Sequence, residues 1–189
     1  SEPTPIGIIE FISTSPEEKM VSKQVSNLIK DDLERSGLFR VIDPKAYIQK
    51  ISTINIQPRF SDWKIINAQA LIVGQSNIQS NGDIRIEFRL WDVFAEQQMA
   101  GWAFNTTRSN WRQISHRIAD KIYERLTGEI GYFDTRIAYV AESGPPKQRI
   151  KRLAIMDQDG ANHRFLTNGK NLVLTPRFSP SQQELTYLS

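Results

Sequence analysis

The sequence PIGIIEFISTSPEEKMVSKQVSNLIKDDLERSGLFRVI, which spans residues 5–42, carries the clearest evidence for the fold class. It begins with Pro5–Phe11, a short apolar run rich in β-branched side chains that is typical of a buried strand. Ser15 can cap a helix after it, and Gly37 can end that helix because glycine accepts the left-handed conformation. Apolar residues share one face of the helix at positions 21, 25, 28, 29 and 33. Since Leu38–Ile42 is typical of a second strand, the stretch predicts a β-α-β unit.

Three more strands and a second long helix are predicted downstream of this unit. Ala70–Gln75 is typical of a central strand, and Asn81-Gly82 is a strong hairpin turn after it. The next strand alternates apolar residues at positions 84, 86, 88 and 90 with charged ones, which predicts one buried face and one solvated face. Met99–Thr106 predicts a further strand, and residues 110–127 predict a helix. We therefore expect residues 1–131 to form an α/β domain, with a mixed sheet of about five strands and two main helices that cover it.

Two segments between these elements are less regular. Residues Ala46–Ile51 suggest a helical turn, and Ser61 suggests the cap of a short helix that reaches Asn67. Trp91 falls on the charged side of its strand, so we expect it to pack under a helix or to face the second domain.

After Gly131 the pattern changes to short strands without helical periodicity. Strands are predicted at Arg136–Ala141, Ile150–Met156 and His163–Leu166, separated by turn dipeptides. The first strand is echoed near the end of the chain at an offset of 185 − 137 = 48 residues, which fits a propeller blade of roughly 40–50 residues. We expect residues 132–189 to form the first blade and the start of the second blade of a truncated β-propeller. Because about three repeats are needed for a stable stack, we also expect this chain to be part of a longer protein.

Composition indicates a soluble globular chain, with 39% hydrophobic and 24% charged residues. No apolar run approaches the roughly 18–20 residues that cross a bilayer, and the N-terminus lacks a signal-peptide pattern. We therefore expect a mature chain without a transmembrane segment. The absence of cysteine excludes disulfides and Cys-based zinc sites. The net charge of +3 comes from interspersed residues, so no nucleic-acid partner is predicted.

Several segments resemble the TolB family, and they occur in the order in which that family has them. The similar segments are Pro5–Phe11, Asp32–Phe39, Ala70–Gln75, Asp120–Gly128, Thr135–Val140, Asp157–Asn162 and Phe178–Pro180. The last two are similar to the family's blade repeat, from which the chain departs at Pro180-Ser181-Gln182, where the repeat has Pro-Asp-Gly. The resemblance implies a periplasmic protein with an N-terminal α/β domain and a six-bladed propeller.

The resemblance also implies protein partners. In the family, the propeller binds a Pal-type lipoprotein, and an arm that precedes the first strand contacts a TolA-type membrane protein. Pro5 and Ile6 lie where that arm would join the domain, so they are the candidate protein-contact residues at the N-terminal edge.

Candidate catalytic and ligand-binding residues are few. We expect His116 on the polar side of the last helix and His163 in a blade turn near Asp157 and Asp159, without the oriented partners that acid–base catalysis needs. Asp157-x-Asp159-Gly160 places its glycine too early for an EF-type calcium loop, and Asp-Gly favours a β-turn instead. The basic run Lys147–Arg152 is short and lacks interleaved aromatic residues, which favours a solvated strand start. No catalytic residue, cofactor-binding residue or metal ligand is predicted.

The resemblance, together with the absence of catalytic motifs, implies a non-catalytic scaffold of the Tol–Pal cell-envelope complex, contributing to outer-membrane integrity and to envelope constriction during cell division. Two alternatives remain open. One is the N-terminal part of a propeller-containing serine peptidase, which a downstream Gly-x-Ser-x-Gly motif would support. The other is an envelope lipid or polysaccharide binder that uses Lys147–Arg152, which salt-sensitive binding to anionic liposomes would support.

Overall fold

A computed structural model describes residues 1–170 and, beyond them, only the backbone of residues 174–178 and 185–188. The chain divides into two compact units, Ser1–Phe133 and Asp134–Ser189. The Pro180-Ser181-Gln182 turn lies outside the described residues. No described helix combines the length and the apolar composition that a bilayer span requires.

The first unit contains a five-stranded mixed sheet with the spatial order β2-β1-β3-β4-β5. The strands are β1 (Thr4–Ile8), β2 (Phe39–Val41), β3 (Ala70–Ile78), β4 (Ile84–Asp92) and β5 (Gln97–Thr106). Strand β1 pairs in parallel with β2 on one side and with β3 on the other, whereas β3-β4 and β4-β5 are antiparallel. The helices are α1 (Pro16–Arg35), α2 (Phe60–Ile65) and α3 (Trp111–Thr127), with single 3-10 turns at Pro44–Ala46 and Arg108–Asn110. The predicted α/β architecture is confirmed.

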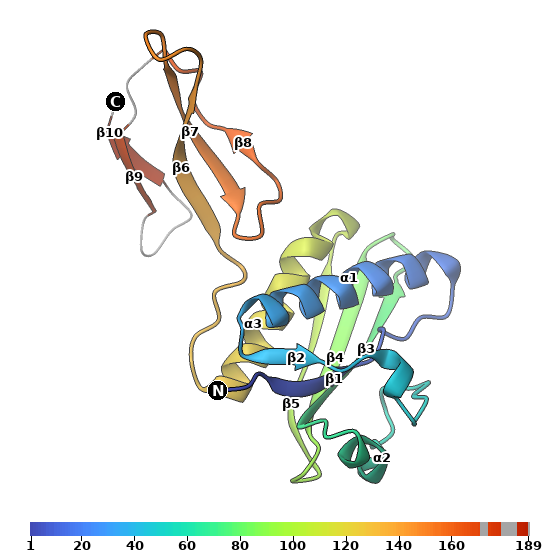
Figure 1. Cartoon of the computed structure of the whole chain (residues 1–189). Coiled ribbons are helices and arrows are strands. Elements are labelled where there is room, and N and C mark those ends of the chain that lie inside the picture. Colours follow the sequence, from blue (N-terminus) through green and yellow to red (C-terminus); the bar gives the residue numbers. More distant parts are fainter. Residues whose placement is uncertain (171–173, 179–184, 189) are drawn as a thin grey trace. The chain divides into compact units, whose positions relative to one another are not determined.

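Helices α1 and α3 cover one face of the sheet, and α2 lies on the opposite face (Figure 1). The alternation predicted for β4 is present, because Ile84, Ile86, Phe88 and Leu90 are all completely buried on the α1–α3 side. Strand β3 is buried on both faces: Ala70 and Ile72 belong to the core under α1 and α3, and Leu71 and Val73 belong to the core under α2. This double burial explains why β3 is a continuous apolar run.

Helix α1 begins and ends where the capping residues in the sequence predicted. The Ser15 side chain accepts a hydrogen bond from the backbone N–H of Glu18 at 3.2 Å, and Gly37 beyond the C-terminal end has φ of 76°. Ser15-x-x-Glu18 also has the spacing of a capping box. Glu18 reaches back to the backbone N–H of Thr14 at 3.4 Å, so the first turn of α1 is tied to the preceding loop.

The segment between β2 and β3 differs from its prediction. Helix α2 starts at Phe60, and no side chain caps it, so the cap predicted at Ser61 is wrong. Instead, Gln49 Oε1 accepts hydrogen bonds from Arg59 N at 2.9 Å and from Trp63 Nε1 at 3.0 Å. The buried indole of Trp63 thus sets the position of this helix, and a tertiary contact of this kind has no local sequence signal.

The helical turn expected at Ala46–Ile51 is also wrong, since the chain becomes extended at Tyr47. This departure lets the Tyr47 ring lie 4.9 Å from that of Trp63, measured between centroids. The Tyr47 hydroxyl lies 2.9 Å from the carbonyl of Ile42 and 3.1 Å from the N–H of Ile8. Tyr47 therefore joins the irregular segment to the ends of β1 and β2. Trp91, on the same side of the sheet, packs edge-on against Phe60 of α2 at 5.8 Å, as expected for a tryptophan under a helix.

The second unit is composed of strands. Strands β6 (Arg136–Ser143), β7 (Ile150–Asp157) and β8 (Arg164–Phe165) form an antiparallel sheet in the order β6-β7-β8. Strands β9 (Leu174–Phe178) and β10 (Leu185–Leu188) form a second antiparallel pair. The predicted succession of short strands is present.

Candidate functional site

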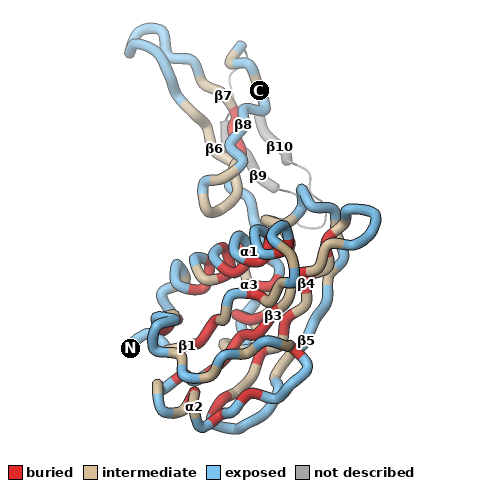
Figure 2. Tube along the Cα trace, turned by 90° about the vertical axis from the view of Figure 1, so that its right-hand side faces the viewer, coloured by how far each residue is buried: buried red, intermediate tan, exposed pale blue. Residues whose placement is uncertain are grey.

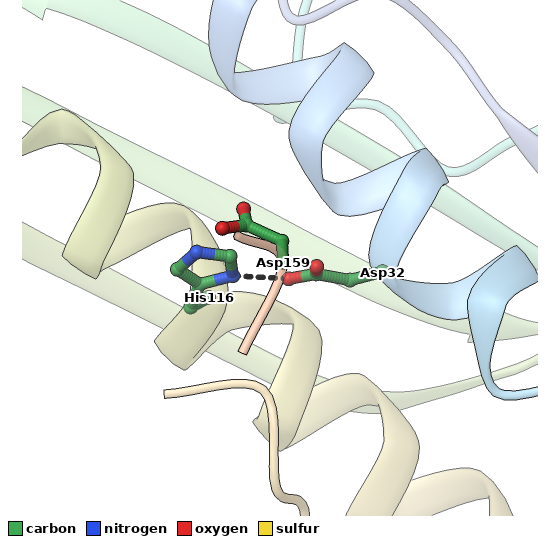
Figure 3. A group of neighbouring side chains, drawn as sticks. All are labelled: Asp32, His116 and Asp159. Carbon is green, nitrogen blue, oxygen red and sulfur yellow. Dashed lines mark hydrogen bonds and ion pairs between the residues drawn. The ribbon is translucent and has the colours of Figure 1, made fainter. Parts of the chain in front are cut away.

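His116 is not on the polar side of α3, so this prediction is wrong. Its side chain is buried, and Nδ1 lies 2.5 Å from the Asp32 carboxylate of α1. Figure 3 shows the His116 ring and the Asp32 carboxylate directed at one another from the two helices. Arg35 of α1 forms an ion pair with the same carboxylate. The arrangement is a polar link inside the α1–α3 contact.

A sequence signal for this link existed. Asp32 lies three residues after Ile29 and four after Leu28 on the apolar face of α1. His116 likewise precedes the buried Ala119 and Tyr123 by three and seven residues. Polar residues inside two apolar stripes indicate a buried pair, because a buried charge requires a partner. Which helix supplies the partner is decided by packing alone.

His163 lies on the surface of the second unit between two aromatic rings. Its ring centroid is 5.8 Å from that of Tyr139 and 5.1 Å from that of Phe165. His163 is therefore a surface side chain that packs between two rings.

The hydrogen bonds of Asp157 and Asp159 support the prediction that these residues form a turn. Asp157 accepts from the Asn162 side chain at 2.7 Å, and Asp159 accepts from the Ala161 N–H at 3.0 Å. Gly160 has φ of 86°, which the turn requires. Both carboxylates thus stabilise the connection from β7 to β8.

The basic run Lys147–Arg152 spans the tip of the β6-β7 hairpin and the start of β7. Glu142 across this hairpin pairs with Arg149 at 3.3 Å and with Lys151 at 3.4 Å. Because one carboxylate neutralises part of the run, its attraction for anionic lipid is weakened.

The structure places the two candidate protein-contact residues, Pro5 and Ile6, within the sheet of the first unit. Both residues lie in β1, which is an inner strand flanked by β2 and β3. Ile6 is completely buried, so its side chain does not face a partner in the folded unit. Pro5 is half-buried, and its contact stays a prediction.

The edge opposite β2 is formed by β5, whose side chains are mostly exposed or half-buried, in contrast to β4 (Figure 2). Trp102 of β5 is 47% exposed. A pocket of about 220 Å³ opens near the first residues of this strand. Met99 of β5, Leu126 of α3 and Phe39 of β2 provide apolar lining, while Asp92, Gln69 and Thr4 provide polar groups.

Comparisons with known proteins agree with the two units. The family model for the TolB amino-terminal domain matches residues 1–99, and the model for the TolB beta propeller domain matches residues 123–189. The Tol-Pal system protein TolB of Paramagnetospirillum magneticum is 55% identical over 188 residues, which cover 100% of this chain and 42% of that protein. The crystal structure of TolB from Acinetobacter baumannii superposes with a TM-score of 0.82 at 26% identity, over 100% of this chain and 44% of the other.

The chain therefore spans less than half the length of the relatives that it matches. The propeller expected from the 48-residue offset is confirmed by the second family model, which begins within α3 and continues through the strands of the second unit. Since a family model covers more than half of the residues, the chain belongs to the TolB family.

Proposed function

We propose that this protein is a non-catalytic scaffold of the Tol–Pal complex in the periplasm. The observation that carries this proposal is the 55% identity, along the whole chain, to a Tol-Pal system protein. In this role it contributes to outer-membrane integrity and to envelope constriction during cell division, through protein contacts alone.

The positions of the candidate catalytic residues support binding rather than reaction. Among the described residues, His116 lies inside a helix–helix contact, and Asp157 and Asp159 stabilise a turn. Acid–base catalysis requires a titratable side chain with access to substrate and an oriented partner. The buried His116 lacks that access, and His163 is flanked by rings.

We propose two classes of protein partner. The propeller, of which residues 134–189 are a part, binds a Pal-type lipoprotein, and a segment next to Pro5 contacts a TolA-type membrane protein. The two-unit organisation supports this division, because each unit presents its own surface.

Affinity purification from detergent-solubilised envelopes tests the proposal. The full-length protein is compared with a variant that ends at Phe133, and co-purified proteins are identified by mass spectrometry. We expect a Pal-type lipoprotein with the full-length protein and its loss from the shortened variant. A His163→Ala variant serves as the control and should retain the lipoprotein. Recovery of no envelope lipoprotein with the full-length protein contradicts the proposal.

A further inference from the structure

The edge strand β5 has an unusual composition for its position. It is ten residues long, and none of the residues from Gln97 to Thr106 is charged. In the described part of the sheet it pairs only with β4. An edge strand presents unpaired N–H and C=O groups, which bind another extended chain, and many proteins block such edges with charged side chains on the strand itself.

Cationic side chains of α3 lie along this edge. The Arg117 guanidinium is 5.4 Å from the Phe104 ring centroid, and Lys121 Nζ is 4.9 Å from that of Trp102. Arg125 Nε donates a hydrogen bond to the carbonyl of Met99 at 2.8 Å. We call β5 together with Arg117, Lys121 and Arg125 the β5 edge surface.

The charge of this row is not neutralised within the described residues, where Arg117, Lys121 and Arg125 form no ion pair. The acidic residues of α3 are engaged elsewhere. Asp120 accepts a hydrogen bond from the N–H of Phe133 at 2.7 Å, and Glu124 accepts one from the N–H of Gly131 at 3.2 Å. The helix therefore directs positive charge toward β5 and negative charge toward the end of the unit.

The spacing of the cations matches that of an added strand. Residues four apart on a helix are separated by about 6 Å along its axis. Alternate residues of a strand are separated by about 6.6–6.8 Å, and their side chains lie on the same face. Carboxylates at every second position of a strand beside β5 can thus face Arg117, Lys121 and Arg125 in turn.

We propose that the β5 edge surface binds an extended acidic segment of a partner protein, which pairs its backbone with β5 and places alternating carboxylates opposite the three cations. Backbone pairing supplies affinity and the charged row supplies specificity, as in other cases of strand addition. The edge also explains why a peptide is favoured over an anionic membrane, since lipid headgroups cannot continue a β-ladder. This inference does not depend on the Tol–Pal assignment.

Synthetic peptides and the full-length protein test the proposal. The probe is a fluorescein-labelled nonapeptide with glutamate at alternate positions and threonine or valine between them, and binding is measured by fluorescence anisotropy. A peptide of the same composition with consecutive glutamates is the first control. Two further peptides carry N-methyl groups on alternate backbone nitrogens, in the two possible phases.

We expect the alternating peptide to bind more tightly than the control peptide. We also expect only one of the two methylated peptides to lose binding, because only one edge of the added strand faces β5. Equal binding of both methylated peptides overturns the strand addition.

Charge reversal tests the cationic row. Arg117→Glu combined with Lys121→Glu should weaken binding of the alternating peptide by roughly tenfold or more. The matched control is Lys19→Glu combined with Lys23→Glu, which changes the net charge equally at two exposed positions of α1 and should alter binding by less than about twofold. Circular dichroism checks that both variants are folded. Equal weakening by the two charge reversals shows non-specific attraction and overturns the proposed site. If the variant with Arg117→Glu and Lys121→Glu is unfolded, binding of the two methylated peptides to the unchanged protein still decides whether a strand is added at β5.

Discussion

At the scale of single residues, Gly74 shows how one position constrains a core. A Cβ atom at Gly74 would lie 2.4–2.6 Å from atoms of the Phe11 ring, far inside van der Waals contact. Phe11 itself is almost completely buried, so the ring has little room to move. The glycine allows β3 to pass directly beneath the ring.

We predict that Gly74→Ala destabilises the protein by about 1–3 kcal/mol, the usual cost of overpacking a core. Urea unfolding followed by circular dichroism measures the change. When Gly74→Ala is combined with Phe11→Leu, the loss of stability should be smaller than the sum of the losses in the two single variants, because the smaller side chain relieves the clash. Strict additivity would show that the ring does not carry the constraint.

Tyr47 provides a pH-dependent contact at the same scale. Burial raises the pKa of the Tyr47 hydroxyl above its usual value, the nearby Asp43 carboxylate raises it further, and the hydrogen bond with the Ile8 backbone opposes the rise. Because the folded state favours the neutral phenol, its contribution to stability is fully present below about pH 10 and is lost as pH rises through the pKa of the folded state.

We predict that Tyr47→Phe lowers the free energy of unfolding by about 1–2 kcal/mol near neutral pH, since backbone groups of Ile8 and Ile42 lose a partner. The difference between wild type and variant should shrink above about pH 10. Urea unfolding of both proteins at about pH 8 and about pH 10.5 provides the measurement. A difference that stays constant over this interval contradicts the assignment.

At the scale of elements, the Asp32–His116 link joins α1 to α3 across 84 positions of sequence. Removing one partner of a buried pair leaves the other without compensation, which typically costs about 3–5 kcal/mol. Arg35 remains beside Asp32 and limits the loss.

We therefore predict that His116→Ala lowers the free energy of unfolding by about 3 kcal/mol. His163→Ala, at an exposed position, should change it by less than about 0.5 kcal/mol and is the matched control. Equilibrium unfolding in urea gives both values. Similar small effects of the two substitutions would mean that the link is energetically unimportant.

The elements also show where sequence reasoning succeeds. The alternation of β4 and the boundaries of α1 and α3 were predicted because each depends on residues within a few positions of one another. Helix α2 was placed with the wrong cap because its start depends on Gln49 and the burial of Trp63. The β5 edge surface was not predicted, since which strand forms an edge depends on sheet order.

At the scale of the whole molecule, the first unit includes the segment after α3. Phe133 is completely buried in the core beneath α1 and α3, and its ring packs edge-on against Tyr123 at 5.6 Å. Gly131 lies so close to Asp120 that a Cβ would be 2.5 Å from its carboxylate. These contacts attach residues 131–133 to the first unit.

We predict that a fragment of residues 1–133 folds by itself and unfolds cooperatively in urea. A fragment of residues 1–128 should be less stable by about 3–5 kcal/mol, the usual cost of removing a buried phenylalanine side chain. Tryptophan fluorescence measures both transitions. Equal stability of the two fragments contradicts the structural role of Phe133, and a non-cooperative transition in the longer fragment contradicts an independent unit.

Local patterns were enough to predict the two-part organisation, the mixed sheet with its covering helices and the change to short strands, because hydrophobic periodicity and turn residues act over short distances. Three features emerged only from the packed fold: His116 is buried beside Asp32, Ile6 is an inner residue, and β5 is the free edge. These features depend on which distant elements pack together, and that choice is made by the summed burial of the whole unit rather than by any local pattern.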